Sequence, residues 1–166
     1  MTLVCIRQPG YMPYLGFFKK IQSCDIFVYF DDTKYVDKGW DNRNQIKTDR
    51  GAMWLTVPVI RKSTELLKDV LIGNDQNWQK KHLKSIELNY RKAPFFQKYW
   101  NAIQSILNTR WNKLIDLNIA LIEYFKMEVG ITTKTILSSE LQIDLPGSLK
   151  LLEICKKLNA KTYLSG

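Results

Sequence analysis

A polar loop between residues 31 and 47 combines several side chains that could bind and act on a small molecule. It begins with the adjacent carboxylates Asp31 and Asp32, which suit a sugar hydroxyl, an amine or a metal ion. Arginine and lysine suit phosphate, and we expect the aromatic rings of this loop to be exposed and to suit a base or a sugar ring. These further groups are Tyr35, Trp40, Asn42, Arg43, Asn44 and Lys47. The alternative for Trp40 is that it caps the core.

Polar residues also stand directly after four segments that are typical of strands. The four groups are Gln8–Tyr14, Asp31–Asp32, Ser138–Glu140 and Ser165–Gly166. In open α/β sheets, ligands bind outside the carboxyl ends of the strands. If the sheet is parallel, the four groups share one edge and form a pocket there. Any one group taken alone is more typical of ordinary turn and helix-cap chemistry.

The first of these groups opens the unusual segment QPGYMPYLGFFKKI, Gln8–Ile21. Its two glycines let the backbone bend or approach another group closely, and its two prolines hold that bend stiff. The aromatic residues Phe17 and Phe18 belong to a following helix and are expected in the core. The residues left to face a pocket are Gln8, Tyr11 and Lys19.

Several common catalytic and cofactor-binding signatures are missing from the sequence. The eight glycines are scattered and form neither a dinucleotide-binding fingerprint nor a P-loop. The single histidine, His82, lies between lysines in a predicted helix without a nucleophile motif nearby, so we expect it at the surface or in a groove. The three cysteines, Cys5, Cys24 and Cys155, are far apart in apolar settings, which favours reduced thiols over a disulfide or metal site. No metal site is predicted, and the sequence identifies no cofactor.

The composition is that of a folded, basic protein. The chain has 166 residues, of which 45% are hydrophobic, and a formal net charge of +9. Such a charge attracts anions, although a solvated basic face is its commoner explanation. We favour a phosphorylated small molecule over nucleic acid because acidic residues are interspersed and no nucleic-acid motif occurs. No apolar run reaches the roughly 18 residues of a membrane span, and the N-terminus does not resemble a secretory signal, so we expect a cytoplasmic protein.

The elements that position these groups alternate between strands and helices. Strands are expected at residues 3–6, 24–30, 132–141 and 161–166, with a hairpin around Arg50 and Gly51 and a further strand in residues 66–75. Helices are expected at residues 16–22, 77–91, 94–107, 112–129 and 147–160. The helix at 112–129 is apolar almost all round, which predicts that it is buried.

This order predicts an α/β fold with a mostly parallel sheet, similar to nucleotidyltransferase-like and Rossmann-like folds, and with a helical insertion at about 76–129. Residues 1–166 are expected to form one domain. The sequence stops directly after a predicted strand, so we expect the native protein to continue. Nucleotidyltransferases carry two histidines in the turn after the first strand, and this turn has none.

Two stretches, QPGYMPYLGFFKKIQSCDIFVYFDD and GWDNRNQIKT, make the chain resemble the WbqC-like protein family. The likeness continues in order through WLTVPV, WQKKHL, KAPFF, DLN, SSEL and TYLSG. Members of this family are found in bacterial O-antigen and surface-polysaccharide gene clusters, so the resemblance implies a pathway more than a reaction. Lys34 stands where the family has glutamine, and Arg7 where it has histidine or methionine, so no role is carried over to these two positions.

Together these observations predict an enzyme of O-antigen or surface-polysaccharide biosynthesis that acts on a nucleotide-linked sugar, with acyl or aminoacyl transfer to an amino sugar as the favoured reaction. Asp32 and Arg43 are the candidate catalytic residues, with Asp32 as general base. The candidate phosphate ligands are Arg43, Lys19 or Lys20, and Lys47, and the candidate stacking residues are Tyr11, Tyr35 or Trp40. The candidate hydrogen-bonding residues are Gln8, Asn42, Asn44, Ser139 and Glu140, and Ser165 is a further candidate substrate-binding residue. The alternative is a sugar-nucleotide-binding or assembly module without catalysis. The oligomeric state stays open.

Overall fold

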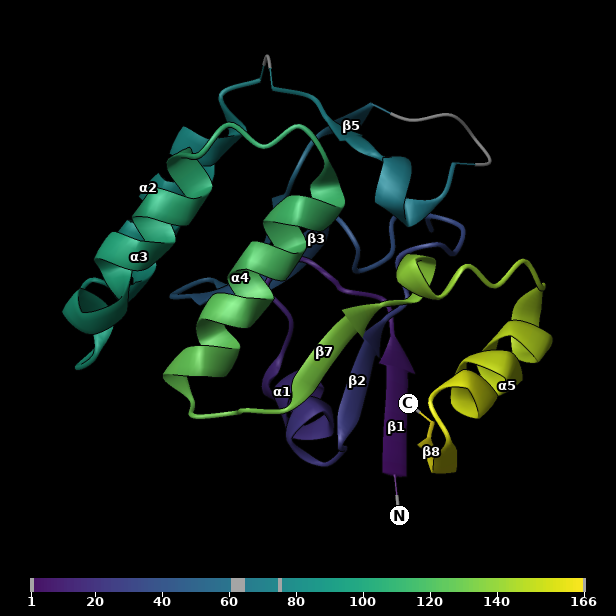
Figure 1. The fold of residues 1–166 in the computed structure, drawn as a ribbon. Coiled ribbons are helices and arrows are strands. Elements are labelled where there is room, and N and C mark those ends of the chain that lie inside the picture. The colour runs from purple at the N-terminus through teal and green to yellow at the C-terminus, as the bar shows by residue number, and fades with distance from the viewer. Residues whose placement is uncertain (1, 61–64, 75, 166) are drawn as a thin grey trace.

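A four-stranded parallel sheet lies at the centre of the molecule (Figure 1). The computed structural model describes residues 2–60, 65–74 and 76–165. The strands are β1 (Thr2–Arg7), β2 (Ile26–Tyr29), β7 (Lys134–Leu137) and β8 (Ala160–Leu164), in the spatial order β7-β2-β1-β8. All three pairings between neighbours are parallel. The predicted α/β fold with a mostly parallel sheet is therefore confirmed.

The two central strands are apolar on both faces because helices cover the sheet from both sides, as is usual for parallel strands. On one face, Cys5 of β1 and Phe27 of β2 pack against α1 (Leu15–Gln22) and α4 (Leu114–Glu128). On the other face, Val4 and Val28 pack with the helix α5 (Gly147–Lys157).

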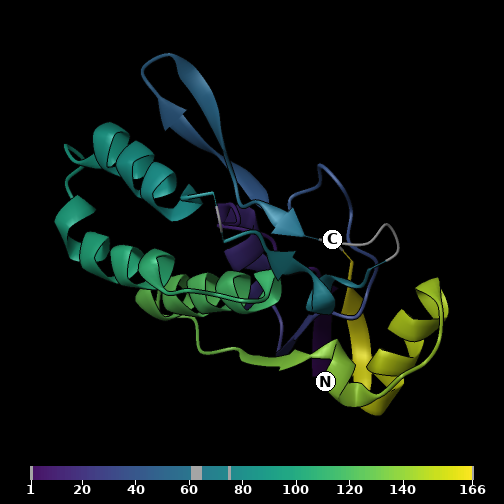
Figure 2. The same ribbon diagram turned by 90° about the horizontal axis from the view of Figure 1, so that it is seen from above.

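The segment between β2 and β7 adds a hairpin and two further helices. The hairpin joins β3 (Arg43–Thr48) to β4 (Gly51–Thr56) and projects from the rest of the molecule, in blue in Figure 2. Beside it lies α2 (Trp78–Tyr90), which packs against α3 (Phe96–Asn108), and both helices precede α4. The predicted hairpin and helical insertion are thus present.

One predicted strand is largely replaced by a turn. The segment 66–75 forms the 3₁₀ turn η1 (Leu67–Asp69) and only a two-residue strand, β6 (Leu71–Ile72), which pairs antiparallel with β5 (Val59–Ile60). A second 3₁₀ turn, η2 (Ser138–Leu141), follows β7 directly and ends that strand before Ser138. The last residues of two predicted strands, Asp75 and Gly166, lie outside the described residues.

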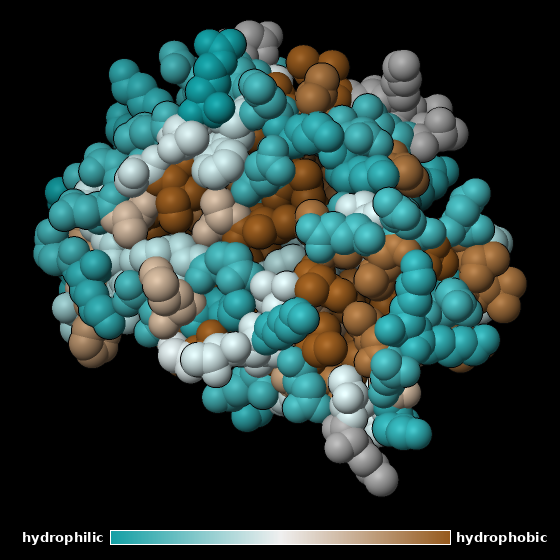
Figure 3. All heavy atoms as spheres, in the orientation of Figure 1, coloured by the Kyte–Doolittle hydropathy of each residue, from teal (hydrophilic) through white to brown (hydrophobic). Residues whose placement is uncertain are grey.

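The helix α4 contributes to more than one part of the core. Its buried side chains include Leu114, Leu117, Leu121 and Ile122, which confirms the prediction made from its apolar sequence. On the face drawn in Figure 3, hydrophilic residues dominate, and hydrophobic ones gather over α4 and beside α5. Among the described residues, no helix is both long enough and apolar enough to cross a membrane.

The loop after β1 is tied to α2 by a buried polar contact between Tyr11 and His82. The Tyr11 hydroxyl lies 2.8 Å from Nδ1 of His82, and Nε2 of the same ring lies 3.2 Å from the Thr56 carbonyl oxygen. This pairing fits a neutral imidazole that donates from Nε2 and accepts at Nδ1. Burial lowers the pKa of His82 to about 4. The expectation of a surface or groove histidine is wrong, because the ring fills a core position and bridges two elements.

Replacing Tyr11 by phenylalanine should lower the free energy of unfolding by about 1–2 kcal/mol, because Nδ1 of His82 then lies buried without a donor. Urea unfolding at neutral pH measures this difference. The matched control is Tyr14→Phe, since the Tyr14 side chain is 61% exposed and its hydroxyl can bond to water. Equal stabilities for the two variants would show that the Tyr11–His82 contact is not a stabilising one.

Candidate functional site

A cavity of about 900 Å³ lies at the carboxyl edge of the parallel sheet. The loops that follow β1 and β2 supply most of its wall, and α5 and β8 each contribute a side chain. The lining includes Arg7, Gln8, Tyr14, Phe30, Thr33, Trp40, Asp41, Asn44, Leu151 and Tyr163. Ligands of open α/β sheets bind at this edge, so this pocket is the candidate site.

Asn118 of α4 holds the two loops of the pocket wall together from beneath. Its side chain is fully buried, and its Nδ2 atom donates to the Pro9 carbonyl at 2.9 Å and to the Asp41 carbonyl at 2.7 Å. A primary amide carries two N–H groups, so both hydrogen bonds can form at once. The loop after β1 and the loop after β2 are therefore fixed to the same side chain.

A direct backbone contact joins the same two loops. The Tyr11 N–H donates to the Trp40 carbonyl at 3.0 Å. A Cβ atom placed on Gly10 would lie 2.9 Å from that carbonyl oxygen, which is closer than real Cβ contacts allow. Glycine is required at position 10 because the backbones approach so closely. The glycine of the QPG motif thus allows the two loops of the pocket wall to pack closely against each other.

Asp41 is a buried carboxyl in the pocket wall. Its side chain is only 4% exposed, and Oδ2 accepts a hydrogen bond of 3.3 Å from the Val36 N–H. Burial raises the pKa of Asp41 to about 6. A carboxyl that titrates near neutral pH inside a pocket is suited to exchange protons with a ligand. Sequence reasoning missed this residue, and only its place in the GWDNRNQIKT motif drew attention to its neighbourhood.

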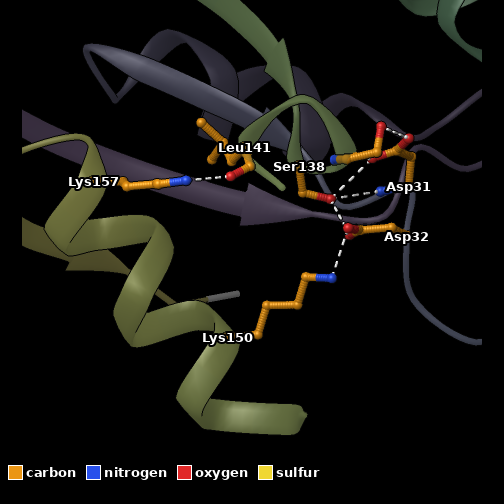
Figure 4. Close-up of polar contacts among 7 residues, drawn as sticks. Asp31, Asp32, Ser138, Leu141, Lys150 and Lys157 are labelled. Atoms are coloured by element: carbon orange, nitrogen blue, oxygen red, sulfur yellow. Dashed lines mark hydrogen bonds and ion pairs between the residues drawn. The ribbon is translucent and has the colours of Figure 1, made fainter. Parts of the chain in front are cut away.

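Asp31 and Asp32, at the end of β2, belong to a polar network beside the pocket (Figure 4). Asp31 accepts hydrogen bonds from the Ser139 N–H at 2.9 Å and the Ser139 hydroxyl at 2.6 Å. The Ser138 hydroxyl oxygen lies 2.9 Å from Oδ1 of Asp31 and 2.5 Å from Oδ1 of Asp32. With one proton, this hydroxyl donates to one of the two carboxylates at a time.

Lys150 completes that network from α5. Its Nζ lies 2.6 Å from Oδ2 of Asp32, and both side chains are about nine-tenths buried. Figure 4 shows Lys150 and Lys157 reaching from α5 toward the loops after β2 and β7, where Lys157 donates to the Leu141 carbonyl. Both oxygens of Asp32 are thus engaged, and neither Asp31 nor Asp32 lines the pocket. The candidate base predicted from the sequence, Asp32, thus lies outside the pocket wall.

The structure brings part of the predicted binding set into the pocket. Gln8, Trp40 and Asn44 line it, and Asn44 also donates to the Met12 carbonyl at 2.6 Å. Tyr11 borders the pocket but is fully buried with its hydroxyl on His82, so it offers no free ring face. Tyr35 was expected to be exposed, and this is wrong, because its ring is buried in the core.

Asn42 and the predicted cations have other surroundings. Asn42 is buried and donates to the Val57 carbonyl at 2.8 Å. Lys19 and Lys20 occupy the last turn of α1, which runs against the strands and ends near the amino edge of the sheet. Lys47 is exposed on the hairpin. None of these three lysines lines the pocket, and Arg7 is the one cationic side chain of its wall within the described residues.

The remaining predicted residues do not line the pocket, and those with hydrogen bonds make them to neighbouring loops and turns. Arg43 donates from Nε to the Gly39 carbonyl at 3.2 Å and from Nη2 to the Lys38 carbonyl. Glu140 is exposed and accepts from the Leu137 N–H at 3.4 Å, while Ser139 is bound to Asp31. Ser165 is exposed after β8. In the part of the chain that the structure describes, no group of three or more His, Cys, Asp or Glu side chains could hold a metal ion.

The family model of the WbqC-like protein family matches residues 8–166, nearly the whole chain. The chain belongs to this family. An uncharacterized protein of Mycobacterium tuberculosis, Rv1507c, is 33% identical to it over 170 residues, which cover all of this chain and 73% of the relative. No solved structure matches the chain significantly. The two segments that carry the family likeness, 8–32 and 39–48, supply most of the pocket wall.

Replacing Asn118 by alanine should lower the free energy of unfolding by about 2–4 kcal/mol, because two buried carbonyl oxygens lose their donor. Urea unfolding measures the loss. Asn101→Ala on α3, where the side chain is exposed, is the matched control and should be close to neutral. An Asn118→Ala protein as stable as this control would contradict the role of Asn118.

Asp41→Asn should stabilise the protein above about pH 6 and have little effect below about pH 4. The raised pKa means that the folded state holds the Asp41 proton up to about pH 6, whereas the unfolded chain releases it near pH 4. The wild type therefore loses about 3 kcal/mol of stability between these two pH values, and the variant does not. Unfolding at a series of pH values tests this, with Asp37→Asn, exposed in the same loop, as the control. A pH-independent difference between wild type and Asp41→Asn would contradict the raised pKa.

Proposed function

We propose that this protein is a cytoplasmic enzyme of bacterial O-antigen or surface-polysaccharide biosynthesis that acts on a nucleotide-linked amino sugar. The pathway follows from the gene clusters in which WbqC-like proteins are found. The favoured reaction is transfer of an acyl or aminoacyl group to the amine of the sugar.

The wall of the pocket supports a ligand of this kind. Arg7 supplies a cation for the diphosphate, since guanidinium binds phosphate oxygens through paired hydrogen bonds. Trp40 and Tyr14 supply ring surface for a base or a sugar, and both are more than half exposed. Gln8 supplies hydrogen bonds to hydroxyl groups, and Oδ1 of Asn44 can accept one, since its Nδ2 already donates to the Tyr11 and Met12 carbonyls. A cavity of about 900 Å³ is in the size range of small-molecule sites.

The observation that carries the proposal is the Asp41 carboxyl in this wall. An amine that attacks an acyl carbonyl must lose a proton as the C–N bond forms. In the proposed reaction the Asp41 carboxylate takes that proton, and the C–S bond of a thioester donor breaks. The departing thiolate then receives the proton from Asp41, so the products are an amide and a free thiol. A pKa near 6 leaves Asp41 largely ionised at pH 7 and still basic enough for this task.

The second candidate function is a sugar-nucleotide-binding or assembly module without catalysis. One observation favours it: the single histidine, His82, is buried against Tyr11 and Thr56 and does not line the pocket. Asp41 is then the lone carboxyl in the pocket wall, within the described residues, with a proton to exchange. Both functions require the protein to bind the same sugar nucleotide, but only the enzyme converts it into a product of different mass.

The direct experiment incubates the protein with a panel of nucleotide-linked amino sugars and thioester donors, and follows binding by thermal shift and products by mass spectrometry. The proposal predicts a bound sugar nucleotide and a product heavier by one acyl group. Asp41→Asn should keep binding and reduce turnover by at least 100-fold, because general base catalysis is worth about 10²–10⁴-fold. Asp37→Asn serves as the control and should retain turnover.

Each other outcome decides against part of the proposal. A bound sugar nucleotide whose mass never changes with any donor would favour the binding module. Full turnover in Asp41→Asn would remove Asp41 from the mechanism. Binding of no sugar nucleotide by the wild type would overturn both functions.

A further inference from the structure

Two tryptophan side chains lie exposed and side by side at the mouth of the pocket. Trp40, in the loop after β2, is 60% exposed, and Trp54, on β4, is 41% exposed. Their ring centroids are 5.3 Å apart, and the ring planes are tilted by 40°. Because indole is large and mostly apolar, a ligand that covers two such neighbouring rings gains the free energy of removing their surface from water.

The hairpin turns Trp54 to this outer surface by strand alternation. On β4, Leu55 points into the core, and the neighbouring Trp54 points to the opposite side. On β3, Asn44 contacts the loop after β1, while Arg43 lies on the same outer side as Trp54. Two strands and one loop therefore present a single aromatic surface.

Arg43 fixes this surface in place. The centre of its guanidinium group lies 4.3 Å from the centroid of the Trp54 ring, and its N–H groups bind the carbonyls of Gly39 and Lys38. A cation over an indole face is attracted to the ring, and the two carbonyls orient it. Arg43 thus joins Trp54 to the loop that carries Trp40. Two of its five N–H groups are thus engaged with backbone, and Arg43 serves here as a positioning residue for the aromatic surface.

We propose that Trp40 and Trp54, held by Arg43, form a second subsite that binds a pyranose ring of a neutral glycan next to the ligand of the main pocket. Trp40 also lines that pocket, so the two sites are continuous. The substrate class is therefore an amino sugar that carries at least one further sugar residue. This deepens the proposed function and rests on it for the identity of the main-pocket ligand.

The geometry distinguishes a sugar from a nucleobase. A flat base can stack in parallel on one ring at a time, because the two rings are tilted by 40° and lie too close together to sandwich it. A puckered pyranose presents axial C–H groups on one face and hydroxyl groups around its edge, so it can contact two tilted rings while its hydroxyl groups stay in water. Two of the five N–H groups of Arg43 are already bound to backbone carbonyls, which leaves it fewer donors for a phosphate than a free guanidinium has.

The test uses the indole N–H signals of ¹⁵N-labelled protein, which Trp→Phe variants assign to each of the five tryptophans. The probes are neutral mono-, di- and trisaccharides of gluco, galacto and manno configuration, and uridine diphosphate as a nucleotide without a pyranose. We expect disaccharides or trisaccharides to shift the Trp40 and Trp54 signals, and uridine diphosphate to leave Trp54 unshifted.

Variants then separate the subsite from general surface effects. Trp54→Ala should weaken disaccharide binding about tenfold, which corresponds to the loss of one ring contact. Arg43→Lys keeps the charge but loses the planar stack, so it should move the free Trp54 indole signal and weaken binding similarly. Phe95→Ala is the matched control, because Phe95 is an aromatic side chain that is 68% exposed elsewhere on the surface. It should bind disaccharide as the wild type does.

Three results would overturn the subsite: no Trp54 shift with any saccharide, a Trp54 shift with uridine diphosphate but not with saccharides, or unchanged saccharide affinity in Trp54→Ala. Because these measurements need no turnover, they are independent of the catalytic role of Asp41. If saccharides bind at Trp54 but the protein transfers no acyl group, the subsite proposal is supported and the proposed enzymatic function is rejected.

Discussion

The two hydrogen bonds from Asn118 to the backbone of Pro9 and Asp41 are the contact on which the candidate site depends. Loops that follow parallel strands have no ladder partners of their own beyond the sheet edge, so their polar backbone groups need other partners when buried. Asn118 supplies them from the middle of an otherwise apolar helix. The Tyr11–Trp40 backbone contact and the space left by Gly10 complete the joint between the loops.

The carboxyl groups at this edge are used in two opposite ways. Asp31 and Asp32 are satisfied by serine groups and by Lys150, so they tie α5 and the turn after β7 to the end of β2. Asp41 is equally buried but receives one backbone hydrogen bond, and its ionised form is therefore disfavoured. A buried carboxyl whose ionised form is poorly stabilised is typical of functional sites, where such a group lowers the stability of the fold but can take part in a reaction.

The sequence predicted the sheet, the hairpin and the buried α4 because each follows a local pattern of apolar residues or turn residues. The side chains of the loops could not be predicted in this way. Tyr11 and Tyr35 sit in irregular segments without a period, so only the tertiary fold shows that both are buried. Lys19 and Lys20 were placed by proximity in sequence, although a helix between parallel strands carries its last turn to the far edge. The raised pKa of Asp41 follows from its burial, which only the tertiary structure shows.

The most direct measurement is an experimental structure of the protein saturated with a nucleotide-linked amino sugar that it binds. The account predicts density in the pocket between the loops after β1 and β2, with the diphosphate on Arg7, a ring against Trp40, and the sugar nitrogen within hydrogen-bonding distance of the Asp41 carboxyl. A ligand seated elsewhere, such as the apolar groove lined by Leu15, Phe18 and Phe125, would contradict it. So would a ligand in the pocket whose amine points away from Asp41.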